Sequence, residues 1–191
     1  LQPNAAWADL LLEPLAEALV AVTGATCVLK NASGRGRARE GLDDLSLALR
    51  GQEPEAPVPV TMNGATYFAD LAHGQKTGLF FDQRDNQAFV KRLAQGATVL
   101  DVFSHVGGFA LACLAGGATE ATVVDSSAQA LALAEQGAAA MDWSLTTRQG
   151  DAFDVLAALG EEGAAYDVVV CDPPAFAPGK AALEAGLRAY E

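Results

Sequence analysis

Predicted strands and helices alternate over the second half of the chain, from residue 98 onward. Four runs have the length and composition of strands: 98–103, 119–125, 145–150 and 166–172. Three segments between them have helical spacing and composition: 109–115, 128–141 and 151–159. This alternation predicts a parallel sheet with right-handed crossovers. The fourth run is apolar throughout, which predicts a strand buried on both faces, and the polar third run suits a sheet edge.

The first part of the chain has a different pattern. Apolar positions recur at helical spacing over 4–22, where Pro14 predicts a kink or a helix that starts near it. Residues 25–30 form a predicted strand, and Asn63-Gly64 between two β-rich runs predicts a hairpin. We therefore expect a small α+β domain over 1–73, with a Pro-rich linker inside it, and a second domain over 74–191.

Four carboxylates stand at the ends of the four predicted strands of the second half. They are Asp101, Asp125, Asp151 and Asp172. Taken singly, each is typical of a helix cap or the start of a loop. Because the carboxyl ends of parallel strands meet at one edge of a sheet, the four together predict a ligand crevice there.

The turn after the first of these strands indicates the kind of ligand. Asp101 is followed by Gly107-Gly108 and an apolar helix, so a strand, a turn and a helix N-terminus come together. The Gly-x-Gly-x-x-Gly pattern of dinucleotide-binding proteins is absent. A carboxylate beside a pyrophosphate is also unfavourable. These features favour a phosphate-free cofactor with a cationic end, such as S-adenosylmethionine, with Asp125 on the ribose hydroxyls and Asp151 and Phe153 at the adenine.

A stretch with glycines at 74 and 78, residues 74–86, precedes this domain's first strand and carries an acid and base cluster. One interpretation is a set of capping ion pairs at a helix start. The other is that Lys76, Asp82, Gln83 and Arg84 close one side of the same pocket.

Composition narrows the choice of partners and compartment. With 51% hydrophobic residues, no apolar run of membrane-spanning length and no leader, the chain is predicted to be cytoplasmic, without a membrane contact. Its three cysteines have no metal-ligand or disulfide spacing, so no metal is expected. The net charge of −12 argues against nucleic-acid binding by bulk electrostatics.

The charge is unevenly distributed between the two halves. Residues 1–100 carry nine Lys and Arg against eleven Asp and Glu, whereas 101–191 carry three against thirteen. A polyanion would therefore meet the first half, where Lys30, Arg35, Arg37 and Arg39 cluster. The alternative for this cluster is a solvated basic loop.

Five motifs together resemble a known family. They are Thr77–Arg84, Val99–Phe109, Val124-Asp125, Gly150–Phe153 and Asp172–Phe176. In this order they resemble the class I methyltransferases of 23S rRNA, specifically the large-subunit cytosine-C5 enzymes, over nearly the whole chain from Leu11 to Tyr190. The resemblance implies a Rossmann-like methyltransferase sheet, incomplete here with about four parallel strands, after a small α+β domain.

The same resemblance implies S-adenosylmethionine as cofactor, ribosomal RNA as partner, and a set of site residues. The implied cofactor-binding residues are Gln83, Arg84, Asp101, Phe103, Ser104, Gly107, Gly108, Asp125, Ser126, Asp151, Ala152 and Phe153. The implied catalytic residues near the target base are Asp172, Pro173 and Pro174. The implied RNA-binding residues are Lys30, Arg35, Arg37, Arg39 and Lys76.

Formation of 5-methylcytosine requires a cysteine thiolate that adds to C6 of the base. In the family this cysteine follows a fifth strand, and no residue of this sequence corresponds to it. Cys171 adjoins Asp172, but adjacent strand residues point to opposite faces. We therefore expect a fragment truncated at both ends, inactive on RNA alone, with an exposed edge of the fourth strand that allows a homodimer.

Other functions stay open at this point. A guanine methyltransferase of the large subunit shares a similar Thr-Gly-Leu-Phe stretch and Asp-Pro-Pro end. Methylation of a small molecule or a protein fits the acidic composition better. A non-catalytic cofactor-binding module is a further alternative.

Overall fold

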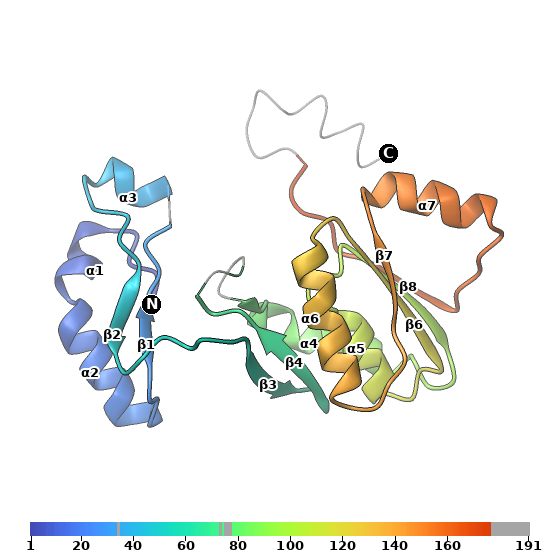
Figure 1. Cartoon of the computed structure of the whole chain (residues 1–191), viewed down its shortest axis with the longest axis horizontal. Coiled ribbons are helices and arrows are strands. Elements are labelled where there is room, and N and C mark those ends of the chain that lie inside the picture. Colours follow the sequence, from blue (N-terminus) through green and yellow to red (C-terminus); the bar gives the residue numbers. More distant parts are fainter. Residues whose placement is uncertain (34, 73, 75–77, 177–191) are drawn as a thin grey trace. The chain divides into compact units, whose positions relative to one another are not determined.

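The computed structural model describes residues 1–33, 35–72, 74 and 78–176, which form two compact units. The first unit contains Leu1–Val58 and Asp70–Thr77, and the second contains Pro59–Ala69 and Gly78–Glu191. Figure 1 shows the helices and strands of each unit along the chain. Among the described residues, no helix is both long and apolar enough to cross a membrane.

The first unit has three helices and a two-stranded antiparallel sheet among its described residues. Its elements are α1 Ala6–Leu10, α2 Leu12–Thr23, β1 Val28–Lys30, α3 Arg35–Arg39 and β2 Leu47–Arg50. The predicted break is confirmed, since α1 ends at Leu10 and Pro14 lies in the first turn of α2, where proline is tolerated. The sequence did not predict α3 or β2.

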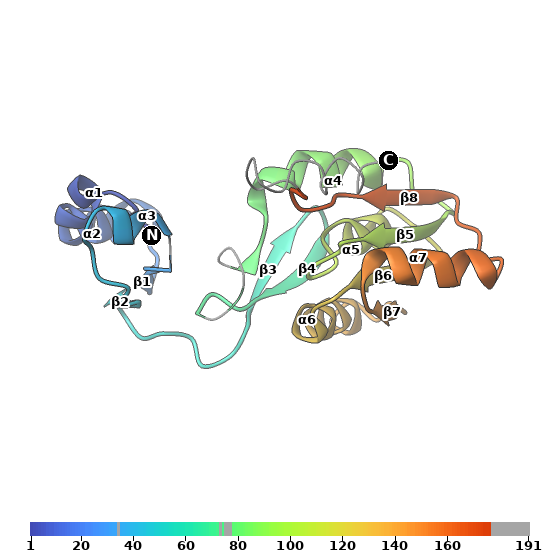
Figure 2. The ribbon, with the colours of Figure 1, turned by 90° about the horizontal axis from the view of Figure 1, so that it is seen from above.

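The second unit is built on a parallel sheet with the strand order β7-β6-β5-β8. Its elements are β3 Val58–Met62, β4 Ala65–Ala69, η2 Phe81–Gln83, α4 Arg84–Lys91, β5 Thr98–Val102, α5 Gly108–Ala115, β6 Glu120–Asp125, α6 Ala128–Ala139, β7 Thr146–Gln149, α7 Ala152–Glu161 and β8 Val168–Cys171. Figure 2 shows β8, β5 and β6 side by side. This is the predicted Rossmann-like arrangement, and all four strand ends lie at one edge.

Helices cover both faces of this sheet. Leu100 and Val102 of β5 pack with Leu159 of α7 in one apolar cluster. The alternate β5 residue, Asp101, contacts the first turn of α5, so α5 lies on the opposite face. Successive β5 side chains therefore contact different helical layers.

The predicted hairpin is present, but it belongs to the larger unit. Asn63 and Gly64 have φ values of 54° and 82°, the left-handed pair that a two-residue hairpin turn requires. A Cβ on Gly137 of α6 would lie 2.8 Å from the carbonyl oxygen of Thr66, and Tyr67 is fully buried. The hairpin therefore packs against the helices of the second unit, which corrects its predicted place in the small first domain.

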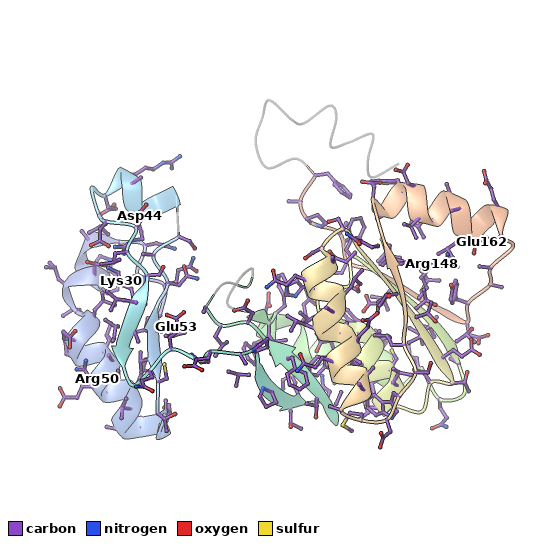
Figure 3. All side chains as sticks on the ribbon, in the orientation of Figure 1. Lys30, Asp44, Arg50, Glu53, Arg148 and Glu162 are labelled. Carbon is purple, nitrogen blue, oxygen red and sulfur yellow. The ribbon has the colours of Figure 1, made fainter. Side chains whose placement is uncertain are left out.

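The two edge strands differ in how they match the sequence. β7 is polar, and its Arg148 forms an ion pair of 2.9 Å with Glu162 (Figure 3), so the predicted edge strand is confirmed. β8 was predicted to be buried on both faces. In the described part of the chain it pairs only with β5, and Val169 is 57% exposed. β8 is therefore an edge strand among the described residues, as expected for the fourth strand, whereas its predicted burial on both faces is wrong there.

Candidate functional site

The loop between β5 and α5 has an unusual backbone. Phe103, His105 and Gly107 have φ values of 63°, 51° and 75°, so three of five successive residues are left-handed. The backbone N–H of Ser104 donates to the carbonyl oxygen of Val124 at 3.0 Å, which ties the loop to β6. The loop is thus held in one shape at the carboxyl edge of the sheet.

Packing explains both glycines of this loop. A Cβ on Gly107 would lie 3.0 Å from the Cβ of Ala134 on α6, and the positive φ also favours glycine. A Cβ on Gly108 would lie 2.8 Å from Nε2 of Gln87, a buried α4 residue to which the sequence assigned no role. The glycine pair thus gives close packing where α4, α5 and α6 meet, whether or not a ligand is bound.

Asp101 is 1% exposed and points into the start of α5. The backbone N–H groups of Phe109 and Ala110 donate to its Oδ2 at 3.2 and 2.9 Å. Burial, together with the charges of Asp172 and Asp125, raises the pKa of Asp101 to about 7, against the lowering effect of these two hydrogen bonds. The resemblance implied a cofactor contact for Asp101, but its hydrogen bonds in the structure go to the helix start.

Two other titratable side chains lie near the Asp101 carboxylate. Burial raises the pKa of Tyr67 well above its usual range, and the charge of Asp101 raises it further. Burial raises the pKa of the Cys113 thiol to about 12, again with a contribution from Asp101. Both groups are therefore neutral at physiological pH, and Cys113 is a structural thiol.

Asp125 ends β6 and connects two segments. Its Oδ2 accepts from the backbone N–H of His105 and its Oδ1 from that of Ser127, both at 2.8 Å. Ser127 caps α6 by accepting from Ala130, whereas Ser126 is exposed beside it. Each carboxylate oxygen keeps a second lone pair, so Asp125 can still accept a hydrogen bond from a ligand.

Asp151 acts as the N-cap of α7. Its Oδ1 accepts from the backbone N–H of Phe153 at 2.9 Å and from that of Asp154 at 3.4 Å. Ala152 is buried in the apolar cluster under α7. Phe153 is 50% exposed, although its ring is apolar. The capping interpretation thus holds for Asp151, and the exposed ring is the feature that capping leaves unexplained.

The segment after β8 carries the predicted catalytic residues Asp172, Pro173 and Pro174. Asp172 is exposed, and its charge acts on Asp101, which places the two carboxylates near one another. Phe176, to which sequence reasoning gave no separate role, contacts the rings of Phe103 and Phe153. Its spacing of four residues from Asp172 is the only local signal for it.

Gln83 and Arg84 lie at the start of α4. Oε1 of Gln83 accepts from Nδ2 of Asn86 at 2.7 Å, whereas α4 has no side-chain cap hydrogen bond, so this contact is not the predicted capping ion pair. Arg84 is exposed. The ring of Phe80 meets that of His105 edge-on at 5.3 Å, so the segment before Gln83 lies beside the glycine loop. Lys76 lies outside the described residues.

Two of the four basic residues in the first unit's cluster, Lys30 and Arg37, are buried, which argues against the predicted RNA contact for these two. Arg37 is 1% exposed and forms ion pairs with Asp9 at 2.8 Å and Asp43 at 3.3 Å. Lys30, labelled in Figure 3, is also buried and pairs with Asp43 at 2.9 Å. These two cations are neutralised by nearby carboxylates and are not available to a phosphate. Arg39 is exposed on α3, which begins at Arg35.

The groups at the carboxyl edge limit what can bind there. The loop and first turn of α5, 103–110, contain no Lys or Arg, and two carboxylates, Asp101 and Asp125, lie beside them. A pyrophosphate would be repelled. A ligand with a cationic end, vicinal hydroxyls and a flat ring matches the acidic surroundings of the loop, the Asp125 carboxylate and the exposed Phe153 ring.

Comparison with known proteins gives the family. Residues 13–190 match the family of S-adenosylmethionine-dependent methyltransferases. Ribosomal RNA large subunit methyltransferase I of Aeromonas salmonicida is 38% identical over 158 residues, covering 81% of this chain and 40% of that protein. The protein of the same name from Pseudoalteromonas translucida is 36% identical over 177 residues, covering 91% and 45%. The chain thus spans less than half the length of these curated relatives.

Solved structures agree with this assignment. A methyltransferase from Streptococcus mutans superposes with a TM-score of 0.74 at 26% identity, covering 89% of this chain and 44% of that one. A methyltransferase solved with S-adenosylhomocysteine superposes with a TM-score of 0.74 at 27% identity, covering 92% and 45%. With its parallel sheet, its loop after β5 and this match over most of its length, the chain belongs to the S-adenosylmethionine-dependent methyltransferase family.

Proposed function

We propose that this chain takes part in S-adenosylmethionine-dependent methylation of ribosomal RNA of the large subunit, and that the product is 5-methylcytosine in 23S rRNA. One observation carries the proposal. A single sheet edge brings together the start of α5, the Asp125 carboxylate, an exposed aromatic ring and the Asp172 segment. The curated relatives named as rRNA methyltransferases support the choice of RNA.

The cofactor supplies an activated methyl group on a sulfonium. In our proposal the cationic ammonium group of its amino-acid end lies on the side of the Asp101 and Asp125 carboxylates, which favour a positive charge there. Asp125 accepts from the ribose hydroxyls with the lone pairs that His105 and Ser127 leave open. Phe153 and Phe103 cover the adenine.

Asp172 is the group we place nearest the target base. It is exposed at the end of β8, and two prolines follow it. A carboxylate there can accept from a base N–H or hold a protonated ring nitrogen. We assign the thiolate step of cytosine-C5 chemistry to none of the three cysteines. Cys113 is buried. The pKa of Cys171 is raised mainly by burial and also by the charge of Asp172.

Binding of the cofactor product tests the first part of the proposal. The chain is titrated by calorimetry with S-adenosylhomocysteine and, separately, with NAD. We expect binding of S-adenosylhomocysteine and none of NAD, because the site lacks a pyrophosphate partner. Binding of NAD alone would overturn the methyltransferase assignment.

Nucleoside analysis tests which base is methylated. The gene segment that encodes residues 1–191 is disrupted in the source organism, and digested 23S rRNA is examined by mass spectrometry. We expect the loss of one 5-methylcytosine, restored by the wild-type gene but not by the Asp125→Ala variant. Loss of a methylguanosine would show that the methylated base is guanine and not cytosine. Unchanged 23S rRNA would overturn the choice of RNA.

A further inference from the structure

Three phenylalanine rings from three different strand ends meet at the carboxyl edge of the sheet. Phe103 follows β5, Phe153 lies in the first turn of α7, and Phe176 follows β8. The ring centroids of Phe103 and Phe176 are 6.0 Å apart at 63°, and those of Phe153 and Phe176 are 5.8 Å apart at 44°. Phe176 is thus the ring that contacts both others.

These rings are incompletely covered. Phe153 is half exposed, while Phe103 and Phe176 are partly buried. The apolar cluster under α7 takes up part of the Phe103 ring, so that ring has a fixed support. The backbone of Phe153 is fixed by its hydrogen bond to the Asp151 cap, and its ring contacts that of Phe176. The apolar surface that these rings leave exposed suits a further flat ring system.

The segment that carries Phe176 also carries Asp172. Between them lie Pro173, Pro174 and Ala175, and the two prolines restrict the backbone because each has a fixed φ. A contact that fixes the Phe176 ring therefore restricts the position of the Asp172 carboxylate four residues earlier. The short, stiff segment 172–176 therefore connects the three phenylalanine rings to the Asp172 carboxylate.

We propose that Phe176 is the third wall of the adenine subsite, together with Phe103 and Phe153, and that the bound adenine fixes the segment 172–176 and with it Asp172. This inference rests on the proposed function and adds a positioning residue to it. In consequence the methyl donor binds before the acceptor base, since Asp172 takes its working position only when the adenine is in place. The ring of Phe176 serves the donor side and not a stack with the target base.

Binding experiments on the 191-residue chain test the ring. Phe176→Ala, Phe176→Leu and Phe176→Tyr are titrated with S-adenosylhomocysteine and with adenosine. The loss of ring contact is expected to weaken both ligands roughly 10-fold in the Ala and Leu variants, whereas Tyr stays near wild type. Phe89→Ala is the matched control, because Phe89 is an exposed ring on α4 that contacts Arg92, and it is expected to bind like wild type.

Hydrogen exchange tests the connection to Asp172. In the wild type, S-adenosylhomocysteine is expected to slow exchange at the backbone amides of Cys171, Asp172, Ala175 and Phe176. In Phe176→Leu at a saturating concentration of S-adenosylhomocysteine, this protection is expected to be lost while protection of the loop 103–108 remains. A purely structural role of Phe176 would leave protection of the segment unchanged.

The outcomes separate this inference from the proposed function. If wild type and Phe176→Leu bind S-adenosylhomocysteine equally well, Phe176 is not part of the adenine subsite, and the methyltransferase assignment stands. If wild type binds neither S-adenosylhomocysteine nor adenosine, both fail. If Phe176→Ala alone is poorly folded, as a lowered Tm would reveal, the Leu and Tyr variants decide.

Discussion

Asp101 on β5 and Ala110 on α5 are joined by a hydrogen bond of 2.9 Å, from the helix backbone to a carboxylate that solvent does not reach. None of the described basic side chains forms an ion pair with this carboxylate. The charge is therefore stabilised by two backbone amides and opposed by burial and by two other carboxylates. This balance gives the protein a pH dependence that can be measured.

Asp101→Asn is expected to stabilise the protein above neutral pH. The pKa of Asp101 is about 7 in the folded chain and about 3.8 in the unfolded one. Between these values the folded state keeps a proton that the unfolded state has released, so the free energy of unfolding falls as pH rises from about 4 to about 7. Asn keeps an acceptor for the two amides, so the gain at pH 8 is on the order of 4 kcal/mol and vanishes near pH 4. Denaturant unfolding at several pH values measures this difference.

Asp167→Asn is the matched control, for which the expected change in stability at pH 8 has the opposite sign. Hydrogen bonds from the backbone and side chain of Thr98 lower the pKa of Asp167 below its usual value. Its stabilising effect is therefore present above the unfolded pKa and is lost as pH falls through the folded pKa. This variant is expected to be less stable than wild type at pH 8. A loss of stability in Asp101→Asn at pH 8 would contradict the penalty on the buried charge.

Gly108→Ala is expected to destabilise the second unit, and removal of the Gln87 side chain is expected to reverse this. The added methyl would lie 2.8 Å from Nε2 of Gln87, so this buried side chain has to shift. In a double-mutant cycle, Gly108→Ala and Gln87→Ala should therefore be non-additive by about 1 kcal/mol, with the double variant more stable than the two single losses predict.

Gly107→Ala is the control for this cycle. Gly107 has a φ of 75°, where alanine costs about 1–2 kcal/mol. Its added methyl would meet Ala134 and not Gln87. Gln87→Ala should leave the effect of Gly107→Ala unchanged, and equal rescue of both glycine variants would refute the contact at Gly108.

Arg37→Met is expected to unfold the first unit and to leave the second intact. The guanidinium donates to Asp9 and to backbone carbonyl oxygens of Pro3 and Asp43. Removing it leaves these acceptors and charges uncompensated, at a cost on the order of 3 kcal/mol. Limited proteolysis should then cleave within Leu1–Val58, while the affinity for S-adenosylhomocysteine stays at the wild-type value.

The companion variant for this prediction is Arg39→Ala. Arg39 is exposed on the same short helix, so its loss removes an equal charge without opening the ion-pair cluster. Protease resistance of the first unit should match wild type. If Arg37→Met is as resistant as Arg39→Ala, the buried ion-pair cluster is not what holds this unit together.

Asp125→Ala is expected to weaken S-adenosylhomocysteine binding about 10- to 100-fold. The change removes the acceptor proposed for the ribose and frees the backbone N–H of His105, which positions the loop. Calorimetric titration measures the loss. Asp142→Asn removes a charge of the same sign just beyond the other end of α6, at a positive φ that Asn tolerates, and should bind normally. Equal affinity of the two variants would remove Asp125 from the cofactor site.

Local patterns were sufficient to predict the sheet. The runs of β5, β6 and β7 and the three helices that follow them agree with the sequence to within a few residues. The hairpin turn was also readable, because Asn63-Gly64 fits very few other backbone conformations. In each case the determining interactions are between residues close in sequence.

Other features depend on contacts between residues distant in sequence. Arg37 appeared to be a basic loop residue because its partner Asp9 lies 28 positions away. The orientation of Asp101 depends on α5, and the packing of the hairpin depends on Gly137, 71 positions after Thr66. A single sequence read by local pattern contains no signal for such pairs, so the strand-end carboxylates could be placed at one edge but not given separate roles.

Because the hairpin belongs to the second unit, the chain crosses from one unit to the other three times. These crossings are at Val58–Pro59, Ala69–Asp70 and Thr77–Gly78. No single cleavage of the chain can therefore release one unit from the other. A shortened protein that begins at Gly78 would also lack the hairpin and expose the α6 surface around Gly137. For expression of the second unit alone, the starting point is therefore Pro59, with residues 70–77 kept in the chain.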